Sequence, residues 1–275
     1  MPFLPRELEC EIFETAFRSD PKNAALRLSL CLVARRVQFW VDLIYYETVT
    51  ISGKSRANQF LDLISRKLPG FFAVAVKILC LVHAVETVQA VAILAACPAV
   101  QHLACWVQQR DYPDLALLIS RLPLSRLWIE FTHFLNVPVA FFSKLTHVEL
   151  VFWESTGIQA PDIYRLIRSF QQLPELTHIA LAFTPSTANQ AHAEAICSSL
   201  PDLRVVIIVR DDAWHDYEEL EMPNDYSFDA RIVTFSRISM DDDWEATNFG
   251  HDNIWSHAEG VIAQRRARSG SPDRT

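Results

Sequence analysis

A spaced apolar pattern recurs six times in the middle of this 275-residue chain and limits what the chain can fold into. The pattern has the form L-x-x-L-x-L, with Val, Ile or Cys allowed at the apolar positions, and successive copies begin roughly 21 to 31 residues apart. A repeat of this length indicates one supersecondary unit that is stacked side by side. The copies are Val76/Leu79/Leu81, Val100/Leu103/Cys105, Leu124/Leu127/Ile129, Leu145/Val148/Leu150, Leu176/Ile179/Leu181 and Leu203/Val206/Ile208.

Four of the copies are preceded by a proline that ends a helical pattern. Proline cannot continue a helix, and the β-branched residues after it favour a strand. Each unit therefore predicts a helix, a proline turn and a short strand, and successive units predict parallel strands side by side with helices outside. The pairs are Cys97-Pro98, Leu122-Pro123, Leu173-Pro174 and Leu200-Pro201.

We predict an α/β fold in which a small N-terminal helical module precedes an irregular solenoid of parallel strands and outer helices. The repeat region resembles irregular leucine-rich repeats, with an ordinary open α/β sheet as the alternative. Such repeats carry an asparagine or cysteine three residues after the last apolar position. This chain does not, so we expect irregular stacking without a ladder of buried asparagines. The residues found there are Gln108, Thr132, Trp153, Thr184 and Asp211.

The C-terminal part of the repeat region needs a cover. The strand predicted at 205–209 is apolar on both faces, and the end of a solenoid cannot leave such a strand exposed. After an acidic loop at 211–226, we expect a last strand at 231–235 and a closing helix at 253–266 to cap it. The predicted parts of the chain are a helical module over 1–48, the repeat region over 49–236, a capping segment with a helix over 237–268, and a disordered tail over 269–275.

A second pattern, at the N-terminus, predicts three short helices. Pro5 suits the first helical position because its fixed φ fits the turn and its missing N–H would be unpaired there. Asp20 is the predicted N-cap of the second helix. Three short helices in about fifty residues bury little apolar surface alone, so they need a partner or the rest of the chain. Their apolar stripes are Leu8/Ile12/Ala16/Phe17, Leu26/Leu30/Val33/Val37 and Phe39/Trp40/Leu43/Ile44.

This opening resembles an F-box, the helical motif that ties substrate receptors to the Skp-type adaptor of cullin–RING ubiquitin ligases. The sequence around residues 20–23 and 39–49 is similar to that of the F-box-like proteins that are numerous in mushroom-forming fungi. Val37 and Gln38 stand where many F-boxes carry a tryptophan, and Trp40 is the nearest substitute. The matching pieces are Leu4-Pro5-x-Glu7-Leu8, Ile12-Phe13 and the run from Leu28 to Arg36.

The resemblance implies a substrate-receptor subunit of an SCF-type ubiquitin ligase, which catalyses nothing itself and whose repeats bind an unknown target protein. The alternative is a non-catalytic repeat scaffold whose F-box-like helices only cap the solenoid. In that case Leu8, Ile12 and Phe13 would be buried under the first repeat. The residues implied to bind the adaptor are Leu4, Pro5, Glu7, Leu8, Ile12, Phe13, Leu30 and Val33.

Alternation of side chains along the predicted strands favours a surface for the target. If Leu103 and Cys105 point into the core, their neighbours point to the concave face, where arginine and tryptophan would be favoured binding anchors. The other interpretation is a solvated polar column with its tryptophans covered by loops. The predicted target-binding residues are His102, Trp106, Arg126, Trp128, His147, Glu149 and His178.

Motifs for common enzyme chemistry are missing from the sequence. It has six glycines and contains no G-x-x-x-x-G-K phosphate loop, no G-x-G-x-x-G turn and no G-x-S-x-G elbow. Cys97, His102 and Cys105, with Cys80 and His83 one repeat earlier, come closest to a metal cluster. Zinc needs four converging ligands, and buried thiols are the simpler interpretation. We therefore expect no catalytic residue, no metal and no cofactor.

Composition narrows the partners and the compartment. The formal charge of −8 argues against nucleic acid as a partner, because phosphate binding needs clustered Lys and Arg. The most apolar stretch, residues 71–107, is interrupted by Lys77, His83 and Glu86 and falls short of a membrane span. Six cysteines without a disulfide spacing, and a start without a basic-then-apolar signal, favour the cytoplasm or the nucleus.

Overall fold

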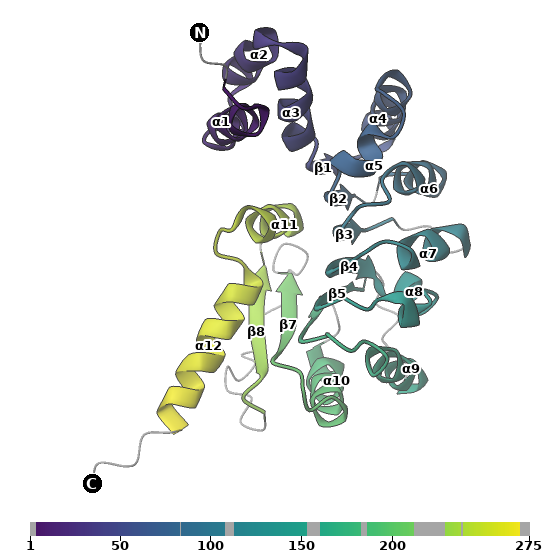
Figure 1. Ribbon diagram of the computed structural model, residues 1–275. Helices are drawn as coiled ribbons and strands as arrows, with labels where there is room; N and C mark the ends of the chain where they lie inside the picture. The colour runs from purple at the N-terminus through teal and green to yellow at the C-terminus, as the bar shows by residue number, and fades with distance from the viewer. Residues whose placement is uncertain are drawn as a thin grey trace.

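The computed structural model places eight parallel strands in one sheet, within the part of the chain that it describes, and their spatial order follows the chain (Figure 1). That part comprises residues 4–82, 84–107, 113–152, 160–182, 186–211, 229–237 and 239–269. The predicted α/β class with parallel strands is confirmed. The strands are β1 (Thr48–Ile51), β2 (Ile78–Leu81), β3 (His102–Cys105), β4 (Arg126–Glu130), β5 (His147–Val151), β6 (His178–Ala182), β7 (Val205–Asp211) and β8 (Ile232–Arg237).

Helices line one face of this sheet, which we call the outer face (Figure 1). From β1 to β7 each strand is joined to the next by a helical segment on this face, as the crossover between parallel strands requires. The outer helices are α4 (Lys54–Arg66), α5 (Phe71–Ala75), α6 (Thr87–Ala96), α7 (Pro113–Ser120), α8 (Phe131–Phe134), the 3-10 helix η1 (Val139–Phe141), α9 (Ala160–Phe170) and α10 (Ser186–Ser199).

The repeated apolar positions form the core between the sheet and the outer helices. The second position of every copy lies in one row across the sheet, in register from strand to strand. These side chains are completely buried, because alternation along each strand turns them toward the outer helices. The row consists of Leu79, Leu103, Leu127, Val148, Ile179 and Val206.

The proline turns lie where the sequence predicts them. Pro98, Pro123, Pro174 and Pro201 each follow the end of an outer helix, namely α6, α7, α9 and α10, and precede the next strand. The structure also contains β1 and α4, which were not predicted. They precede the first copy of the pattern, so no spaced triplet or proline turn marks them.

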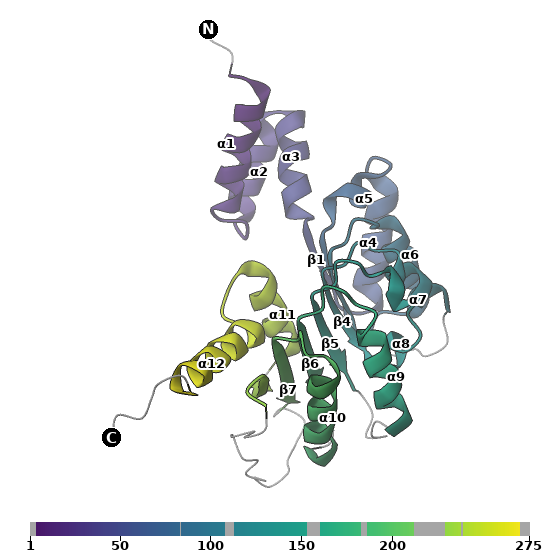
Figure 2. The same cartoon turned by 60° about the horizontal axis from the view of Figure 1, so that its bottom comes forward.

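Three helices form the N-terminal module, as predicted. The module has a small core of its own, in which Phe17, Val37, Trp40 and Val41 are buried. It projects beyond the β1 end of the sheet, and its third helix runs into β1 (Figure 2). The helices are α1 (Arg6–Arg18), α2 (Ala24–Val33) and α3 (Arg35–Tyr45).

The helix starts in this module differ in detail from the prediction. Pro5 lies at the N-cap of α1, one residue before the helix. The predicted N-cap of the second helix is wrong, because Asn23, rather than Asp20, accepts a hydrogen bond from the backbone N–H of Leu26 (2.9 Å). Asp20 instead accepts a hydrogen bond from the side-chain amide of Asn23 (3.0 Å). Asparagine satisfies the free N–H groups of a helix start as well as aspartate does.

The C-terminal part of the chain returns to the sheet and caps it, as predicted. β8 pairs with β7, while α11 (Met240–Phe249) and α12 (Ile254–Ser269) lie against the face opposite the outer helices, which we call the inner face (Figures 1 and 2). The helix α12 matches the predicted closing helix, whereas α11 was not predicted. Residues 212–228 and 270–275 lie outside the described residues, and with them most of the predicted acidic loop (211–226) and of the predicted tail (269–275).

Residues 71–107, the most apolar stretch, supply α5, β2, α6 and β3 and belong to the core. Among the helices that the structure describes, none combines the length and the apolar character needed to cross a bilayer.

Candidate functional site

The outward side of α1 carries an uncovered apolar row. Leu8 and Ile12 are four residues apart, so helical geometry places them on one side of α1, with Leu4 just before the helix. Leu4, Leu8 and Ile12 are 51%, 48% and 55% exposed. Pro5 and Glu7 are also exposed at this end of the helix. Phe13, which was predicted beside them, is only half-buried and packs against the module's own core.

A second apolar row lies on α2. Leu28 and Leu32, again four residues apart, are 65% and 86% exposed, and Val33 beside them is 58% exposed. Leu30, which was predicted in this set, instead packs against the core of the module. Sequence reasoning selected Leu30 and missed Leu28 and Leu32, although their spacing marks one face of a helix. We call Leu4, Leu8, Ile12, Leu28, Leu32 and Val33 the apolar rows.

Polar contacts hold the module together without using these rows. Arg36 of α3 donates two hydrogen bonds to Glu9 of α1, at 2.7 and 2.8 Å, and this contact lowers the pKa of the Glu9 carboxyl. Asp42, which is buried, accepts one hydrogen bond from Arg27 of α2 (3.0 Å) and one from Lys67 (2.6 Å), just after α4. Since Asp42 links α2, α3 and the sheet domain, the module is fixed while its apolar rows stay in water.

The predicted polar column of the sheet exists on the inner face. His102, Arg126, His147 and His178 are neighbours in register on β3 to β6. They lie at the first position of each strand, so they point to the face opposite the core row. The alternation argument therefore placed them correctly relative to one another.

The predicted openness of this face is wrong, because α11 and α12 cover it. Trp106, Trp128, Glu149 and His178 are at most 4% exposed, whereas His102, Arg126 and His147 are half-buried. They are covered because most of the neighbouring inner-face positions are apolar, and exposing so large an apolar surface to water is unfavourable. The apolar residues that the strands, and the positions directly after β2 and β3, contribute to this inner core are Cys80, Val82, Ala104, Trp106, Trp128, Val151, Ala180, Ala182, Val205, Ile207, Val209 and Val233.

The cover contributes aromatic and aliphatic side chains from both of its helices. The ring of Trp244 in α11 packs edge-on against Trp128, with 5.1 Å between the centroids. From α12, Ile254, Trp255, Ala258 and Ile262 repeat at helical spacing and face the sheet. Each of these side chains is at most 4% exposed, so the cover is packed as tightly as a protein core.

Three members of the polar column also form hydrogen bonds with the cover. His102 Nδ1 lies 2.7 Å from Asn248 Oδ1, and Arg126 donates to the backbone carbonyl of Thr247 (3.1 Å). His178 Nε2 lies 3.2 Å from the carboxylate of Glu259 in α12. Asn248, Thr247 and Glu259 were not singled out in the sequence, because nothing local marks a residue that meets a strand more than 80 positions away.

His147 and His178 form a stacked pair. Their ring centroids are 4.1 Å apart with 7° between the planes, and Trp255 packs edge-on against both. The hydroxyl of Thr146 donates to the carbonyl of Ser125, so the Nδ1–H of His147 donates to that hydroxyl oxygen (2.8 Å). This arrangement uses one ring nitrogen of His147, which is half-buried.

Desolvation disfavours the charged form of the three histidines in this column. It lowers the pKa of His147 to about 2, and the positive charge of Arg126 and any proton on His178 act in the same direction. Burial likewise lowers the pKa of His102, although the hydrogen bond with Asn248 opposes the effect. The pKa of His178 is also lowered by burial, against the opposing influence of Glu259.

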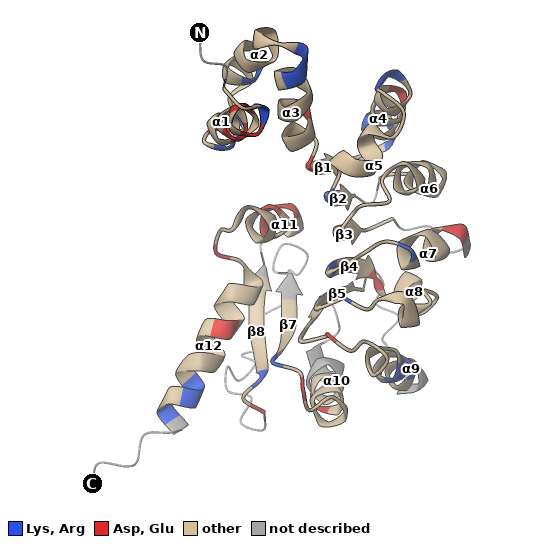
Figure 3. Cartoon of the chain, viewed as in Figure 1, with Lys and Arg blue, Asp and Glu red and all other residues tan. Residues whose placement is uncertain are grey.

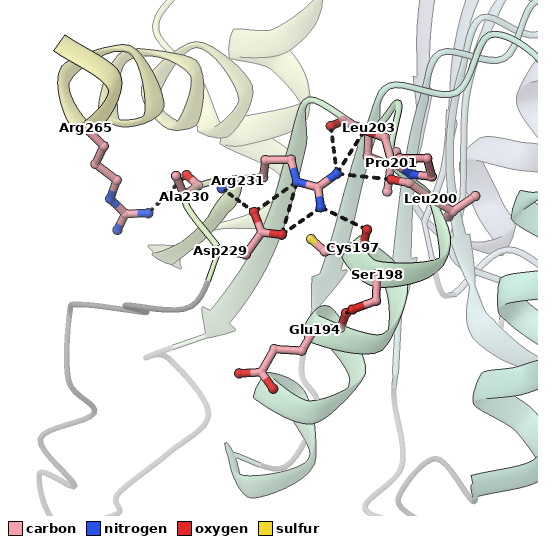
Figure 4. A network of polar contacts seen from close by, with 10 residues as sticks. All are labelled: Glu194, Cys197, Ser198, Leu200, Pro201, Leu203, Asp229, Ala230, Arg231 and Arg265. Atoms are coloured by element: carbon pink, nitrogen blue, oxygen red, sulfur yellow. Dashed lines mark hydrogen bonds and ion pairs between the residues drawn. The ribbon is translucent and has the colours of Figure 1, made fainter. Parts of the chain in front are cut away.

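A second polar cluster anchors β8 and α12 at the far end of the sheet (Figure 4). The guanidinium of Arg231 donates to both oxygens of Asp229, with the shortest contact at 2.7 Å, which lowers the pKa of that carboxyl. It also donates to the carbonyls of Cys197, Leu200, Pro201 and Leu203, which close the C-terminal end of α10. From α12, Arg265 donates to the carbonyl of Ile232 (2.6 Å).

Charges elsewhere on the cover follow the helix dipoles. Acidic residues gather at the start of α11 and basic residues toward the end of α12 (Figure 3). Asp241, Asp242 and Asp243, which could have suggested a cation site, form the first turn of α11. Ser239 accepts a hydrogen bond from the N–H of Asp242 there (3.2 Å).

The cysteines behave as structural thiols. Burial raises the pKa of Cys97 and of Cys105 to about 12. Cys105 belongs to the outer core, whereas His102 faces the inner side, so the two cannot converge on one ion. His83 lies outside the described residues, and within those residues no group of three potential ligands could hold a metal ion.

Comparison with protein-family models gives no match for this chain, and comparison with curated proteins gives none either.

Proposed function

We propose that this protein is a non-catalytic receptor subunit of an SCF-type ubiquitin ligase, working in the cytoplasm or the nucleus. Its N-terminal module would be an F-box-like unit that binds a Skp-type adaptor of a cullin–RING ligase. Its sheet and outer helices would be an irregular leucine-rich-repeat-like solenoid that serves a protein target. One observation carries the proposal: six large apolar side chains, five on α1 and α2 and Leu4 just before α1, stay in water while other contacts hold the module in place.

The apolar rows can supply a useful docking energy. Burying a fully exposed Leu, Ile or Val side chain stabilises a complex by about 1.5–3 kcal/mol. Because the six side chains are half to mostly exposed, each contributes about 1 kcal/mol when covered, and together about 6 kcal/mol before the cost of association. This is enough to make the rows the dominant anchors of an interface.

The alternative role, in which the helices only cap the solenoid, fits the structure less well. A cap would bury Leu8 and Ile12 against the rest of the chain, but both remain about half exposed. The module contacts the sheet domain through other residues, among them Asp42 and Lys67. The free side of α1 therefore favours a second polypeptide as its partner.

Binding of the purified protein to a purified Skp-type adaptor tests the proposal. Leu8→Asp combined with Ile12→Asp should weaken binding at least about 100-fold, because about 3 kcal/mol of burial and desolvation is at stake. Val88→Asp is the matched control, since Val88 is similarly exposed (61%) but lies on α6. Equal binding by the double variant and the control would refute adaptor docking through these rows.

A further inference from the structure

The inner core combines two kinds of residue that rarely share a permanent interior. Its apolar side chains pack tightly, yet the same interface holds three histidines and an arginine. His178 is buried and the other three are half-buried, and ionisable groups that are removed from water cost stability unless they are fully paired. Three buried indole N–H groups, those of Trp106, Trp244 and Trp255, also have no hydrogen-bond partner among the described residues. The contact between sheet and cover therefore buries many apolar side chains, but it also encloses polar groups that water would satisfy better.

We propose that α11 and α12 form a proton-sensitive cover, which separates from the inner face of the sheet when the histidine column takes up protons. Separation would place Trp106, Trp128 and Arg126 in water as a new surface. This proposal depends only on how α11 and α12 pack on the sheet and is independent of adaptor docking. If the receptor role holds, its release is the step that gives a target access to the inner face.

The geometry disfavours added charge in the covered state. His147 and His178 stack at 4.1 Å, so a proton on one ring opposes a proton on the other. The fixed charge of Arg126 lies beside His147 on β4, and Arg204, which precedes β7, adds a further positive charge near His178.

Few negative groups face the column. α11 contributes the neutral Asn248 and the carbonyl of Thr247, while α12 contributes Glu259, whose carboxylate meets His178. Glu149 lies two residues beyond His147 on the same face of β5. The ring of His147 itself contacts Thr146, His178 and Trp255, so a proton added there gains no carboxylate partner through these contacts.

The sign of the effect follows from the direction of the pKa shifts. The covered state lowers the pKa of His102, His147 and His178, and an uncovered histidine returns to about 6.5. The covered state is therefore fully favoured above about pH 6.5 and loses its advantage as the pH falls below that value. Between pH 7.5 and 5.5, His147 alone shifts the balance toward the uncovered state by about tenfold, and His102 and His178 shift it further in the same direction.

Two native cysteines on opposite faces of the sheet report the opening. Cys80 on β2 lies in the inner core beneath the cover, whereas Cys105 on the neighbouring β3 lies in the outer core. Both are completely buried. Release of the cover exposes only Cys80, while unfolding of the sheet exposes both. The ratio of their labelling rates also cancels the intrinsic pH dependence that thiol reactions share.

The experiment labels the intact protein with 4,4′-dithiodipyridine, which reacts with thiols in acid, and resolves each cysteine by mass spectrometry. Lowering the pH from 7.5 to 5.5 should raise the Cys80-to-Cys105 rate ratio at least about tenfold. His102→Gln combined with His147→Gln should remove most of that rise. His251→Gln should leave it intact, because His251 is exposed in the turn before α12. A ratio that stays constant with pH, or a rise that the double variant retains, overturns the proposal.

If the double variant unfolds, Cys105 labels as fast as Cys80 at both pH values, and the single variant His147→Gln decides instead. It should reduce the rise about tenfold, and an undiminished rise counts against the proposal. Adaptor binding at pH 7.5 separates this result from the proposed function, since the histidine variants leave α1 and α2 untouched. Failure of either test therefore leaves the other conclusion standing.

Discussion

The side chain of Ile262 offers a direct measure of how firmly the cover is attached. It is 4% exposed and lies on the sheet-facing side of α12, four residues after Ala258 and within the inner core. The helix packs across β7 and β8, the strands that would otherwise end the sheet with an apolar face in water. We therefore choose Ile262→Ala, which shortens this side chain without introducing charge.

The expected loss of stability can be worked from the size of the side chain. Alanine lacks three carbon atoms of isoleucine, and each buried carbon contributes about 0.8 kcal/mol, or about 2.4 kcal/mol in all. The cavity that remains adds to this loss, so the free energy of unfolding should fall by about 3 kcal/mol, within the usual range for Ile→Ala in a core. For a chain of this size the melting temperature should drop by about 6–12 °C.

Urea unfolding followed by tryptophan fluorescence tests this expectation, because Trp244 and Trp255 lie in the same core as Ile262. Far-ultraviolet circular dichroism in the same samples shows whether the sheet unfolds with the cover. Gln264→Ala, on the exposed side of the same helix, is the control and should change stability by less than about 0.5 kcal/mol. An Ile262→Ala curve that overlays the control would show that α12 is not packed on the sheet.

Two further predictions concern polar anchors. Asp42→Ala removes the carboxylate shared by Arg27 and Lys67, and should destabilise the protein by about 1–3 kcal/mol in urea unfolding, with Asp62→Ala, an exposed ion-pair residue on α4, as the control. Arg231→Ala leaves the carbonyls at the end of α10 without donors and should cost about 2 kcal/mol, whereas an unchanged melting temperature would mean that solvent replaces Arg231 fully.

The repeat was predictable because its signals are local. A triplet such as Val100, Leu103 and Cys105 carries the alternation of a strand, and the proline before it ends the preceding helix. These two rules place six strands, their register and the core row between sheet and outer helices. They do not predict β1, which lies before the first copy of the pattern and pairs with β2.

The cover could be predicted only in part, for two different reasons. The helix α11 begins with three aspartates and was not predicted, although acidic residues suit the first turn of a helix capped by Ser239. The polar column was placed correctly by alternation, but its burial depends on residues such as Asn248 and Glu259, far away in sequence. Local patterns indicate which side chains share a face and cannot indicate what lies on top of it.

The joint between the helical module and the sheet determines how far apart two bound molecules would be held. Only Tyr46 and Glu47 separate α3 from β1, and the ring of Tyr46 packs edge-on against Phe71 and Phe72 at the start of α5. With so short and so well-packed a junction, the molecule acts as a rigid bracket rather than as two units on a tether. Anything seated on α1 and α2 is thereby kept at a constant angle and span from anything seated on the sheet domain.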